Sequence, residues 1–378
     1  MVTRPIICFP FIGDSHGGSY ISSAILIRQL VDRGYTVKIV LHENGRFSEY
    51  LQERSIEHLV LPICHSRHSK GSRLQLIFFF ITRNLISLYR FLRKNRITLV
   101  HTNDMRTQFL WALPCLLASV RHVWHQRTTF RPSRLAQFFL ARASGVICIS
   151  NFVRDSLPAL PSNNVCVIAN AIHPTLPTEI AVSACRAELT EDIDISSPFA
   201  IIGWFNTLRQ LKRPDVFAQA IAELHEQHSG HIVVIVFGED REFWKTKMLE
   251  YLPKNSSRLQ MLFKGFSNNV YPWMAACDVI VSTSTEDGFG RTLIEAMQLR
   301  IPVVAADAGG HKEIITHRIT GLLAPPGDAS ATADAIKLLL VDSELVSNLT
   351  AAAYSKAITQ FSPERNCEQV EQFYLDLL

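Results

Sequence analysis

The sequence contains no C-x-x-C pair, and its eight cysteines stand mostly within apolar stretches such as Val-Ile-Cys148-Ile. A free cysteine in such a setting behaves as a small hydrophobic residue. The cysteine pattern therefore argues against a disulfide scaffold and a cysteine-based zinc site, and it favours a reducing, cytoplasmic compartment. Walker A and H-E-x-x-H motifs are also absent, which removes the usual signatures of NTPases and metalloproteases.

The sequence also lacks a long apolar run. The best candidate, Leu74 to Leu92, is interrupted by polar and charged residues, among them Arg83 and Arg90. Its uninterrupted apolar part, Leu76 to Ile81, is far shorter than the roughly 20 residues that a membrane span requires. The N-terminus leads directly into a short apolar strand and shows no targeting signal. We therefore expect a cytoplasmic protein without a transmembrane helix.

The overall composition is that of an ordinary globular protein. Of the 378 residues, 47% are hydrophobic and 19% are charged, with 17 glycines and 17 prolines. These proportions exclude a disordered or collagen-like chain. At roughly 100–200 residues per domain, the length predicts two or three domains, each large enough to bury its own core.

Acidic residues are scarce in the first half of the chain. Residues 1–175 carry 21 Lys and Arg against 8 Asp and Glu, whereas residues 176–378 carry 17 against 26. Residues 67–96 contain no acid and interleave Lys and Arg with Leu, Ile and Phe. This pattern favours a basic amphipathic element that meets an anionic membrane surface or a phosphate-rich acceptor, although a core helix with a solvated cationic rim has the same signature. Nucleic acid is not an expected partner, because no nucleic-acid motif accompanies the charge.

Short Val- and Ile-rich runs alternate with segments of helical period, which predicts parallel sheets covered by helices. The first helix is expected over about residues 19–33 and should end at Gly34. Its buried face would consist of Ile21, Ile25 and Leu30. We predict strands over residues 6–11, 36–41, 58–63, 98–101, 122–125, 145–149 and 165–169, and then over 199–203, 231–237, 259–263, 279–282, 302–305 and 321–323.

The chain turns polar and acidic from Pro174 to Pro198, which predicts a domain boundary near Pro174. The two domains would span residues 1–174 and 175–361, and each would be a doubly wound α/β sheet. Ligands of such sheets bind outside the carboxyl ends of the strands, so the expected site is a cleft between the two domains. A D-x-D motif at Asp192 to Asp194 lies in the polar segment and not after a strand, so we interpret it as solvated linker and predict no metal site there.

The most informative stretch is Glu286 to Ile315, EDGFGRTLIEAMQLRIPVVAADAGGHKEII. A helix begins close to Arg291, and the backbone N–H groups at its start can bind an anion. Asp287 in the loop and Glu295 on the second turn can both reach a ligand that lies across the helix start, where carboxylates would accept hydrogen bonds from sugar hydroxyls or a ribose diol. Alternatively, Asp287 only caps the helix and Glu295 is a surface charge.

This stretch resembles the signature of glycosyltransferase family 4, the retaining glycosyl transferases group 1, which is written E-x7-E with G-F-G inside it and E-A-M at its end. Upstream, Gly203 and the segment 212–215 (Lys-Arg-Pro-Asp) resemble the donor-phosphate loop of the family. The resemblance spans nearly the whole chain, and it is strong over residues 199–330 and weak before residue 145. The signature continues downstream in order through Pro302 to Ala305, Ala308 to Gly310, Glu313 and Gly321 to Leu323.

The resemblance implies a GT-B fold, an α/β architecture of two facing Rossmann-like, doubly wound domains with an inter-domain cleft. The first domain would bind the acceptor, and the second would bind the nucleotide sugar. A helix over about residues 362–378 would pack back on the first domain.

The resemblance also implies roles for individual residues. Glu295 would hold the ribose, and Asp287 would hold the donor sugar, although Glu286 directly before it is an equal candidate for the functional acid. Lys212 would stabilise the leaving diphosphate, which gains negative charge as the anomeric C–O bond breaks. The other donor-binding positions implied in this half are Arg209, Phe289, Gly290, Arg291 and Thr292.

In the first half, Gly17 and Gly18 follow the first strand and would let the backbone approach the donor phosphates at the start of the first helix. His101 and His125 each end a strand. The resemblance favours His125 as a catalytic residue on the acceptor side, whereas a single histidine at such a position is more often structural.

We therefore predict a retaining glycosyltransferase of the hexosyl or N-acetylhexosaminyl type. It would move a sugar from a nucleotide-diphosphate donor to a hydroxyl of a glycan or lipid-linked acceptor, in the synthesis of bacterial lipopolysaccharide or another cell-surface polysaccharide. No metal or other cofactor is expected, and the basic half would contact the inner face of the cytoplasmic membrane. The alternatives are a sugar-nucleotide epimerase or phosphorylase of the same fold, and a catalytically silent GT-B subunit that binds without turnover.

Overall fold

The computed structural model describes residues 4–14, 17–63, 73–131, 133–160, 164–173, 176–191, 198–254 and 256–378, and of residues 73–82 it describes the backbone alone. The chain divides into two compact units. Unit 1 comprises Met1–Ala171 together with Pro363–Leu378, and unit 2 comprises Ile172–Ser362. The division after Ala171 lies close to the boundary predicted at residue 174, and the terminal segment that returns to unit 1 is helix α15 (Pro363–Leu377).

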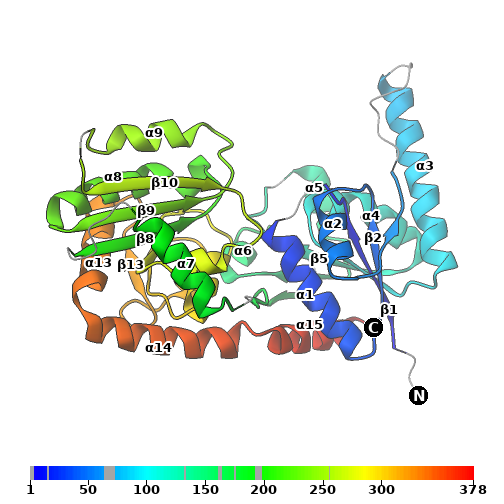
Figure 1. Cartoon of the computed structure of the whole chain (residues 1–378). Coiled ribbons are helices and arrows are strands. Elements are labelled where there is room, and N and C mark those ends of the chain that lie inside the picture. The colour runs from blue at the N-terminus through cyan, green and yellow to red at the C-terminus, as the bar shows by residue number, and fades with distance from the viewer. Residues whose placement is uncertain are drawn as a thin grey trace. The chain divides into compact units, whose positions relative to one another are not determined.

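Unit 1 is built on a parallel sheet whose described strands follow the order β3-β2-β1-β4-β5-β6-β7 (Figure 1). The strand β1 pairs with β2 on one side and with β4 on the other, so the direction in which strands are added reverses between β1 and β4. This reversal is the topological switch point at which doubly wound sheets bind ligands. The strands are β1 (Ile6–Phe11), β2 (Thr36–Leu41), β3 (Leu59–Val60), β4 (Leu99–Thr102), β5 (Arg121–Gln126), β6 (Gly145–Cys148) and β7 (Val165–Val167).

The edge strand β3 is shorter than the strand predicted over residues 58–63. Among the described strands it pairs with β2 alone, and Leu59 and Val60 are both exposed. A short edge strand offers few unpaired backbone groups to other chains. The helices of unit 1 are α1 (Gly18–Asp32), α2 (Arg46–Glu53), α3 (Arg73–Lys94), α4 (Met105–Ala118), α5 (Arg134–Leu140), α6 (Asn151–Asp155) and α15.

The buried face of helix α1 differs from the predicted one. The helix ends before Gly34, which adopts a φ of +83° as expected for a glycine at a helix terminus. Leu26, Ile27 and Leu30 are buried, whereas Ile21 and Ile25 are only half-buried. The buried face is rotated because it also has to bring polar side chains of the helix, such as Ser23, against the loop that follows β4.

Helix α15 completes the core of unit 1, although it is the last helix in the sequence. Its residues Val370, Tyr374 and Leu377 are buried in one cluster with Phe9 of β1 and Val123 of β5. At the rim of this cluster the Glu371 carboxylate accepts hydrogen bonds from Tyr35 Oη at 2.7 Å and from Arg33 Nη1 at 2.9 Å.

Helix α3 carries the described part of the predicted basic segment. Leu88 and Leu92 are buried in a cluster with Trp111 of α4, whereas Arg90, Arg93 and Lys94 are exposed. The helix is therefore amphipathic, with one face in the core and a cationic face outside it. Figure 1 shows its N-terminal part extending beyond the sheet of unit 1. Residues 67–72 of the basic segment lie outside the described residues.

Unit 2 repeats the same topology, with a described sheet in the order β10-β9-β8-β11-β12-β13 and a switch point between β8 and β11. Its strands are β8 (Phe199–Phe205), β9 (His231–Phe237), β10 (Leu259–Gly265), β11 (Val279–Ser282), β12 (Val303–Ala306) and β13 (Leu322–Ala324). The α-helices are α7 (Glu179–Leu189), α8 (Pro214–Gln227), α9 (Trp244–Tyr251), α10 (Tyr271–Ala275), α11 (Arg291–Gln298), α12 (His311–Ile314), α13 (Ala329–Val341) and α14 (Ser343–Gln360).

The polar segment after Pro174 is not wholly a linker. Thr178 accepts a hydrogen bond from the backbone N–H of Ala181 and so caps α7. Arg186 of this helix donates to the Ala276 carbonyl at 2.9 Å and to Asp278 at 3.0 Å. These contacts hold α7 against the rest of unit 2. The D-x-D motif at residues 192–194 lies outside the described residues.

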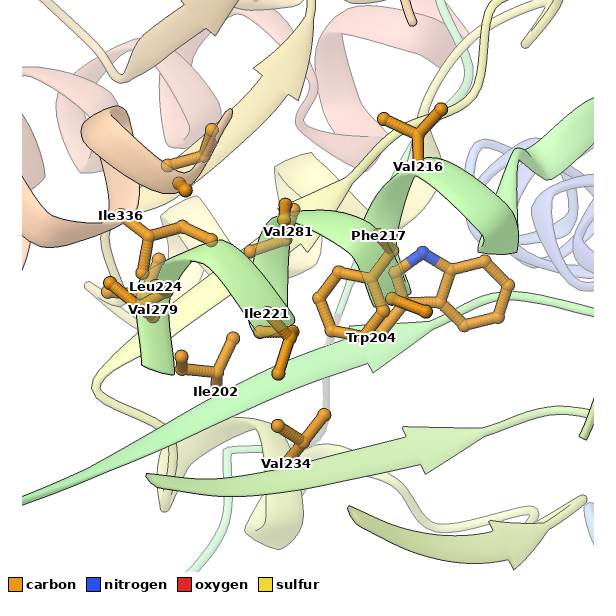
Figure 2. Packing of buried hydrophobic residues seen from close by; sticks show 14 of the residues in the cluster. Ile202, Trp204, Val216, Phe217, Ile221, Leu224, Val234, Val279, Val281 and Ile336 are labelled. Atoms are coloured by element: carbon orange, nitrogen blue, oxygen red, sulfur yellow. The ribbon is translucent and has the colours of Figure 1, made fainter. Parts of the chain in front are cut away.

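Apolar side chains of β8, β9 and β11 pack with those of α8 and α13 in the core of unit 2 (Figure 2). Phe217 and Trp204 stack with a ring-centroid distance of 6.0 Å, and both are fully buried. No helix in the described parts of the chain combines the length and the apolar character needed to cross a membrane. The described cysteines are free thiols.

The fold predicts that alanine substitutions at two phenylalanines of unit 2 have very different effects on the stability of the protein. Phe217→Ala should lower the free energy of unfolding by about 3–5 kcal/mol, because it removes a fully buried ring and leaves a cavity. Phe243→Ala, at a position where the ring is 84% exposed, should change it by about 0.5 kcal/mol or less. Urea denaturation of both variants checks this, and equal losses would contradict the packing described.

Candidate functional site

The strongest cluster of predicted site residues lies at the switch point of the unit 2 sheet. Lys212 ends a short 3-10 helix (Gln210–Lys212) in the segment that follows β8, and Asp287 lies in the loop that follows β11. The strands β8 and β11 are neighbours in the sheet. Two loops that are distant in sequence therefore meet where a doubly wound sheet binds its ligand.

Hydroxyl groups at the end of β11 hold the Lys212 segment in place. Thr283 Oγ1 lies 3.0 Å from the Lys212 carbonyl oxygen and 2.9 Å from that of Arg213, and it donates to them. Ser284 Oγ donates to the Leu211 carbonyl at 3.0 Å. Both hydroxyl side chains are buried. These contacts fix the backbone that carries the Lys212 side chain.

Lys212 and Asp287 form a close ion pair. Lys212 Nζ lies 2.5 Å from Asp287 Oδ2, and His311 Nε2 of α12 lies 3.8 Å from the same oxygen. Burial raises the pKa of Asp287, but the charge of Lys212 and the contact with His311 lower it by more. The pKa of this carboxyl group therefore lies well below its usual range, and Asp287 is ionised at neutral pH.

Glycines let the Asp287 loop approach the loop after β12. The Gly310 N–H donates to the Asp287 carbonyl at 2.8 Å. A Cβ atom on Gly309 would lie 2.6 Å from the Asp287 carbonyl oxygen, and one on Gly310 would lie 2.7 Å from that of Gly288. A side chain at either position would push the Asp287 loop away, because backbone atoms cannot move aside as a flexible side chain can.

Helix α11 begins at this loop and carries a partly buried ion pair on its first two turns. Gly290 caps the helix with a φ of +94°, a conformation that favours glycine. Arg291 Nε lies 2.7 Å from Glu295 Oε1, and Tyr271 Oη donates to the same oxygen at 3.4 Å. Both contacts use Oε1, so the predicted ribose-binding carboxylate is positioned by its neighbours through one oxygen.

The structure distinguishes the two candidate acids. Asp287 is half-buried and paired with Lys212, whereas Glu286 is exposed. Arg209 is also exposed and precedes the 3-10 helix that ends at Lys212. Asp287 is therefore the acid that the fold brings to the Lys212 ammonium group.

Two other predicted donor-binding residues have structural contacts. The Phe289 side chain is buried, and its ring meets that of Phe361 edge-on at a centroid distance of 5.8 Å. Thr292 Oγ1 donates to the Phe205 carbonyl at 2.9 Å, which ties the start of α11 to the end of β8. Any contact of these residues with a ligand would therefore come mainly from the backbone.

The remaining predicted site residues belong to unit 1. Gly17 precedes α1, and its carbonyl accepts the N–H of Tyr20, while Gly18 is the first residue of the helix. Both glycines are exposed. His125 is only 1% exposed, and its Nδ1 lies 2.9 Å from His101 Nε2. The two histidines, which were alternative candidates in the sequence analysis, are therefore hydrogen-bonded to each other.

Sequence reasoning missed several residues of the unit 2 site, namely Tyr271, Thr283, Ser284 and His311. Thr283 and Ser284 directly follow a predicted strand. Polar residues at the carboxyl end of a strand in a doubly wound sheet indicate a ligand site, so these two could have been predicted. His311 follows the Gly309-Gly310 pair, but nothing in the local pattern places its ring near Asp287. Among the described residues, no group of three or more His, Cys, Asp or Glu side chains is arranged to hold a metal ion.

Two family models match the chain in tandem. The model described as Glycosyltransferase Family 4 matches residues 16–176, and the one described as Glycosyl transferases group 1 matches residues 186–356. The second match includes the ion pair between Lys212 and Asp287.

Curated relatives include a synthase, a galactosyltransferase and a mannosyltransferase by name. The chain is 29% identical over 248 residues to N-acetyl-alpha-D-glucosaminyl L-malate synthase of Bacillus anthracis, a match that covers 65% of this chain and 63% of that protein. It is 22% identical over 369 residues to UDP-Gal:alpha-D-GlcNAc-diphosphoundecaprenol alpha-1,3-galactosyltransferase of Escherichia coli, with 92% and 91% coverage. A lipopolysaccharide core biosynthesis mannosyltransferase of Rhizobium leguminosarum is 29% identical over 47% of this chain and 51% of that protein.

Solved structures share the fold. Anabaena HepE, solved in complex with UDP and glucose, superposes with a TM-score of 0.77 at 21% identity, covering 98% of this chain and 99% of that one. A glycosyltransferase from Rickettsia africae superposes with a TM-score of 0.82 at 19% identity, with 99% and 98% coverage. The predicted α/β fold class is confirmed, and the chain belongs to glycosyltransferase family 4, the glycosyl transferases group 1, with a GT-B fold.

Proposed function

We propose that the chain is a retaining glycosyltransferase that moves a hexosyl or N-acetylhexosaminyl group from a nucleotide-diphosphate sugar to a hydroxyl of a glycan or lipid-linked acceptor. The observation that carries the proposal is the meeting of Lys212 and Asp287 at the switch point of the unit 2 sheet. A cation and a carboxylate side by side suit a ligand that presents phosphates next to sugar hydroxyls.

In the proposed reaction the bond between the anomeric carbon and the diphosphate oxygen breaks, and a bond from the acceptor oxygen to the same carbon forms on the same face. The leaving diphosphate gains negative charge, which Lys212 stabilises from a fixed backbone. The acceptor proton passes to the departing phosphate. Asp287 accepts hydrogen bonds from the donor sugar, and Glu295 accepts them from the ribose. In this scheme Lys212 supplies the positive charge, and the reaction needs no metal ion.

The relatives support the choice of donor and acceptor. HepE was solved with UDP-glucose, and the Escherichia coli relative acts, by its name, on an N-acetylglucosamine carried by diphosphoundecaprenol. The Rhizobium relatives are named for lipopolysaccharide core biosynthesis. We therefore place the proposed reaction in the synthesis of a bacterial cell-surface polysaccharide or lipopolysaccharide, with unit 2 binding the donor and unit 1 the acceptor.

A lipid-linked acceptor would require unit 1 to reach a membrane, and the outer face of α3 supports such a contact. A groove of about 520 Å³ lies between β3 and the C-terminal part of α3. Arg90, Arg93 and Lys94 line it together with the apolar side chains of Leu59 and Tyr89. Cationic groups beside apolar surface suit the anionic inner face of the cytoplasmic membrane, where we propose that the protein acts.

The donor-site proposal predicts a ligand-induced shift of the unfolding temperature. In the presence of EDTA, one of UDP-glucose, UDP-galactose, UDP-N-acetylglucosamine and GDP-mannose should stabilise the protein, by about 2.7 kcal/mol at 100 times its dissociation constant. Lys212→Ala should abolish the shift, whereas Lys254→Ala, at an exposed position in the same unit, should retain it. An unchanged shift in Lys212→Ala would remove Lys212 from the donor site.

The two candidate acids should differ in turnover. Asp287→Asn should lower kcat by about 10²-fold or more, because the carboxylate positioned by Lys212 loses its charge. Glu286→Gln should leave kcat nearly unchanged, since that side chain is exposed. Steady-state kinetics with the donor identified by the thermal shift checks the pair. A wild-type protein that binds the donor without any turnover would instead be a silent subunit.

The membrane contact predicts a dependence on lipid charge. In flotation at low salt, the protein should bind vesicles that contain phosphatidylglycerol and not vesicles of phosphatidylcholine alone, and binding should weaken as salt is added. Arg90→Glu with Lys94→Glu should lose binding. Arg28→Glu with Arg121→Glu changes the net charge equally at exposed positions elsewhere in unit 1 and should retain it. Equal losses in both pairs would show a nonspecific charge effect.

A further inference from the structure

A chain of buried polar contacts connects the C-terminal helix of unit 1 to the end of strand β5. Tyr374 Oη of α15 contacts His101 Nδ1, and His101 Nε2 lies 2.9 Å from His125 Nδ1. Arg127 Nη2 lies 3.3 Å from the same Nδ1 atom of His125. Tyr374 and His101 are fully buried and His125 almost fully, among the apolar side chains that cover this face of the sheet.

Both imidazole rings are neutral in this environment. Burial and the nearby charge of Arg127 lower the pKa of His101 and of His125 well below the usual range. A neutral imidazole has one N–H and one acceptor nitrogen, so each ring can adopt either of two tautomers. The neighbouring groups decide which tautomer is present.

The positive charge of Arg127 favours one arrangement of protons. Its guanidinium group lies 3.3 Å from His125 Nδ1, where it attracts a lone pair and repels an N–H, so the proton of that ring is favoured on Nε2. His101 Nε2 must then donate to His125 Nδ1, because two acceptor lone pairs would repel each other. His101 Nδ1 is left as an acceptor, which requires the Tyr374 hydroxyl to donate to it.

This arrangement leaves a polar hydrogen without a partner. Nε2 of His125 is buried and has no hydrogen-bond partner among the described residues. His125 stands one residue before the end of β5, at the edge of the sheet where the loops after β4 and β5 gather. There Arg127 Nη2 donates to Asn103 at 2.8 Å and to Ser23 at 3.0 Å. Buried N–H groups in folded proteins are nearly always paired, so an unpaired one beside this edge calls for a group that binds there.

We propose that Tyr374 is a positioning residue that acts through His101 to hold His125 with its proton on Nε2, so that this N–H donates to a hydroxyl oxygen of the bound sugar or acceptor. The proposal rests on the proposed glycosyl transfer for the identity of the ligand. The tautomer of His125 is independent of that function. Tyr374 itself touches neither ligand nor reacting atoms.

A double-mutant cycle separates this role from simple packing. Tyr374→Phe removes the hydroxyl and retains the ring, and it should lower kcat/KM by about 10-fold or more, as loss of groups that orient a functional imidazole does elsewhere. His125→Gln keeps an N–H donor near the Nε2 position and has no tautomers. In the His125→Gln background, Tyr374→Phe should therefore have almost no further effect. The same loss factor in both backgrounds would overturn the proposal.

The matched control is Tyr35→Phe. Tyr35 also donates its hydroxyl to α15, at 2.7 Å to Glu371, and this hydrogen bond does not involve either imidazole ring. This variant should show a comparable change in thermal stability and no change in kcat/KM. A fall in kcat/KM equal to that of Tyr374→Phe would show that loosening α15 is sufficient and would overturn the assignment.

Nitrogen-15 NMR of the imidazole rings in the full chain tests the proton positions without turnover. His125 should carry its proton on Nε2 in the wild type, and Tyr374→Phe should move proton density to Nδ1 of His101. A wild-type spectrum with the proton on Nδ1 of His125 would refute the proposal, whatever the activity. If no nucleotide sugar is turned over but the NMR result holds, the proposed function fails and the tautomer assignment stands.

Discussion

The ion pair between Lys212 and Asp287 joins loops that follow two different strands of unit 2, and the rest of the candidate site is arranged around it. Each partner is held by its own supports. Thr283 and Ser284 fix the backbone of the lysine segment, and the close approach of Gly309 and Gly310 fixes that of the aspartate loop. Because both backbones are already fixed, only the side chains of Lys212 and Asp287 have to be ordered when the charges pair, which reduces the entropy lost.

The two sheets share the place at which they present polar groups. In both described sheets the first three strands are added in one direction and the fourth lies on the other side of the first, and polar side chains gather at the carboxyl ends next to that reversal. In unit 2 the gathered groups include the ion pair of Lys212 with Asp287, and in unit 1 they include that of Arg106 with Asp14. Unit 1 adds the contacts among Tyr374, His101 and His125, which involve no carboxylate. One topology thus presents different sets of polar groups at the same place in the two sheets.

The sequence predicted the elements better than the contacts. All the predicted strands were found, because Val- and Ile-rich runs between helical segments are a strong local signal. The strand predicted over residues 58–63 was longer than the observed β3, and the predicted buried face of α1 was wrong. Both errors arise because the exposure of an edge strand and the packing of α15 depend on residues distant in sequence. Lys212, Asp287 and Glu295 were identified from a family signature, and Glu286 could be separated from Asp287 only by their burial. His101 and Tyr374 could not be linked from sequence at all, because 273 positions separate them.

Helix α15 has a consequence for the order in which the protein is made. The strands of unit 1 are synthesised before unit 2, but Tyr374, Val370 and Leu377 of its core are synthesised after the whole of unit 2. Until then Phe9 and Val123 lack the side chains that cover them. During translation unit 1 therefore has an open apolar surface until α15 is made, and a chaperone or a neighbouring nascent chain has access to it in that period.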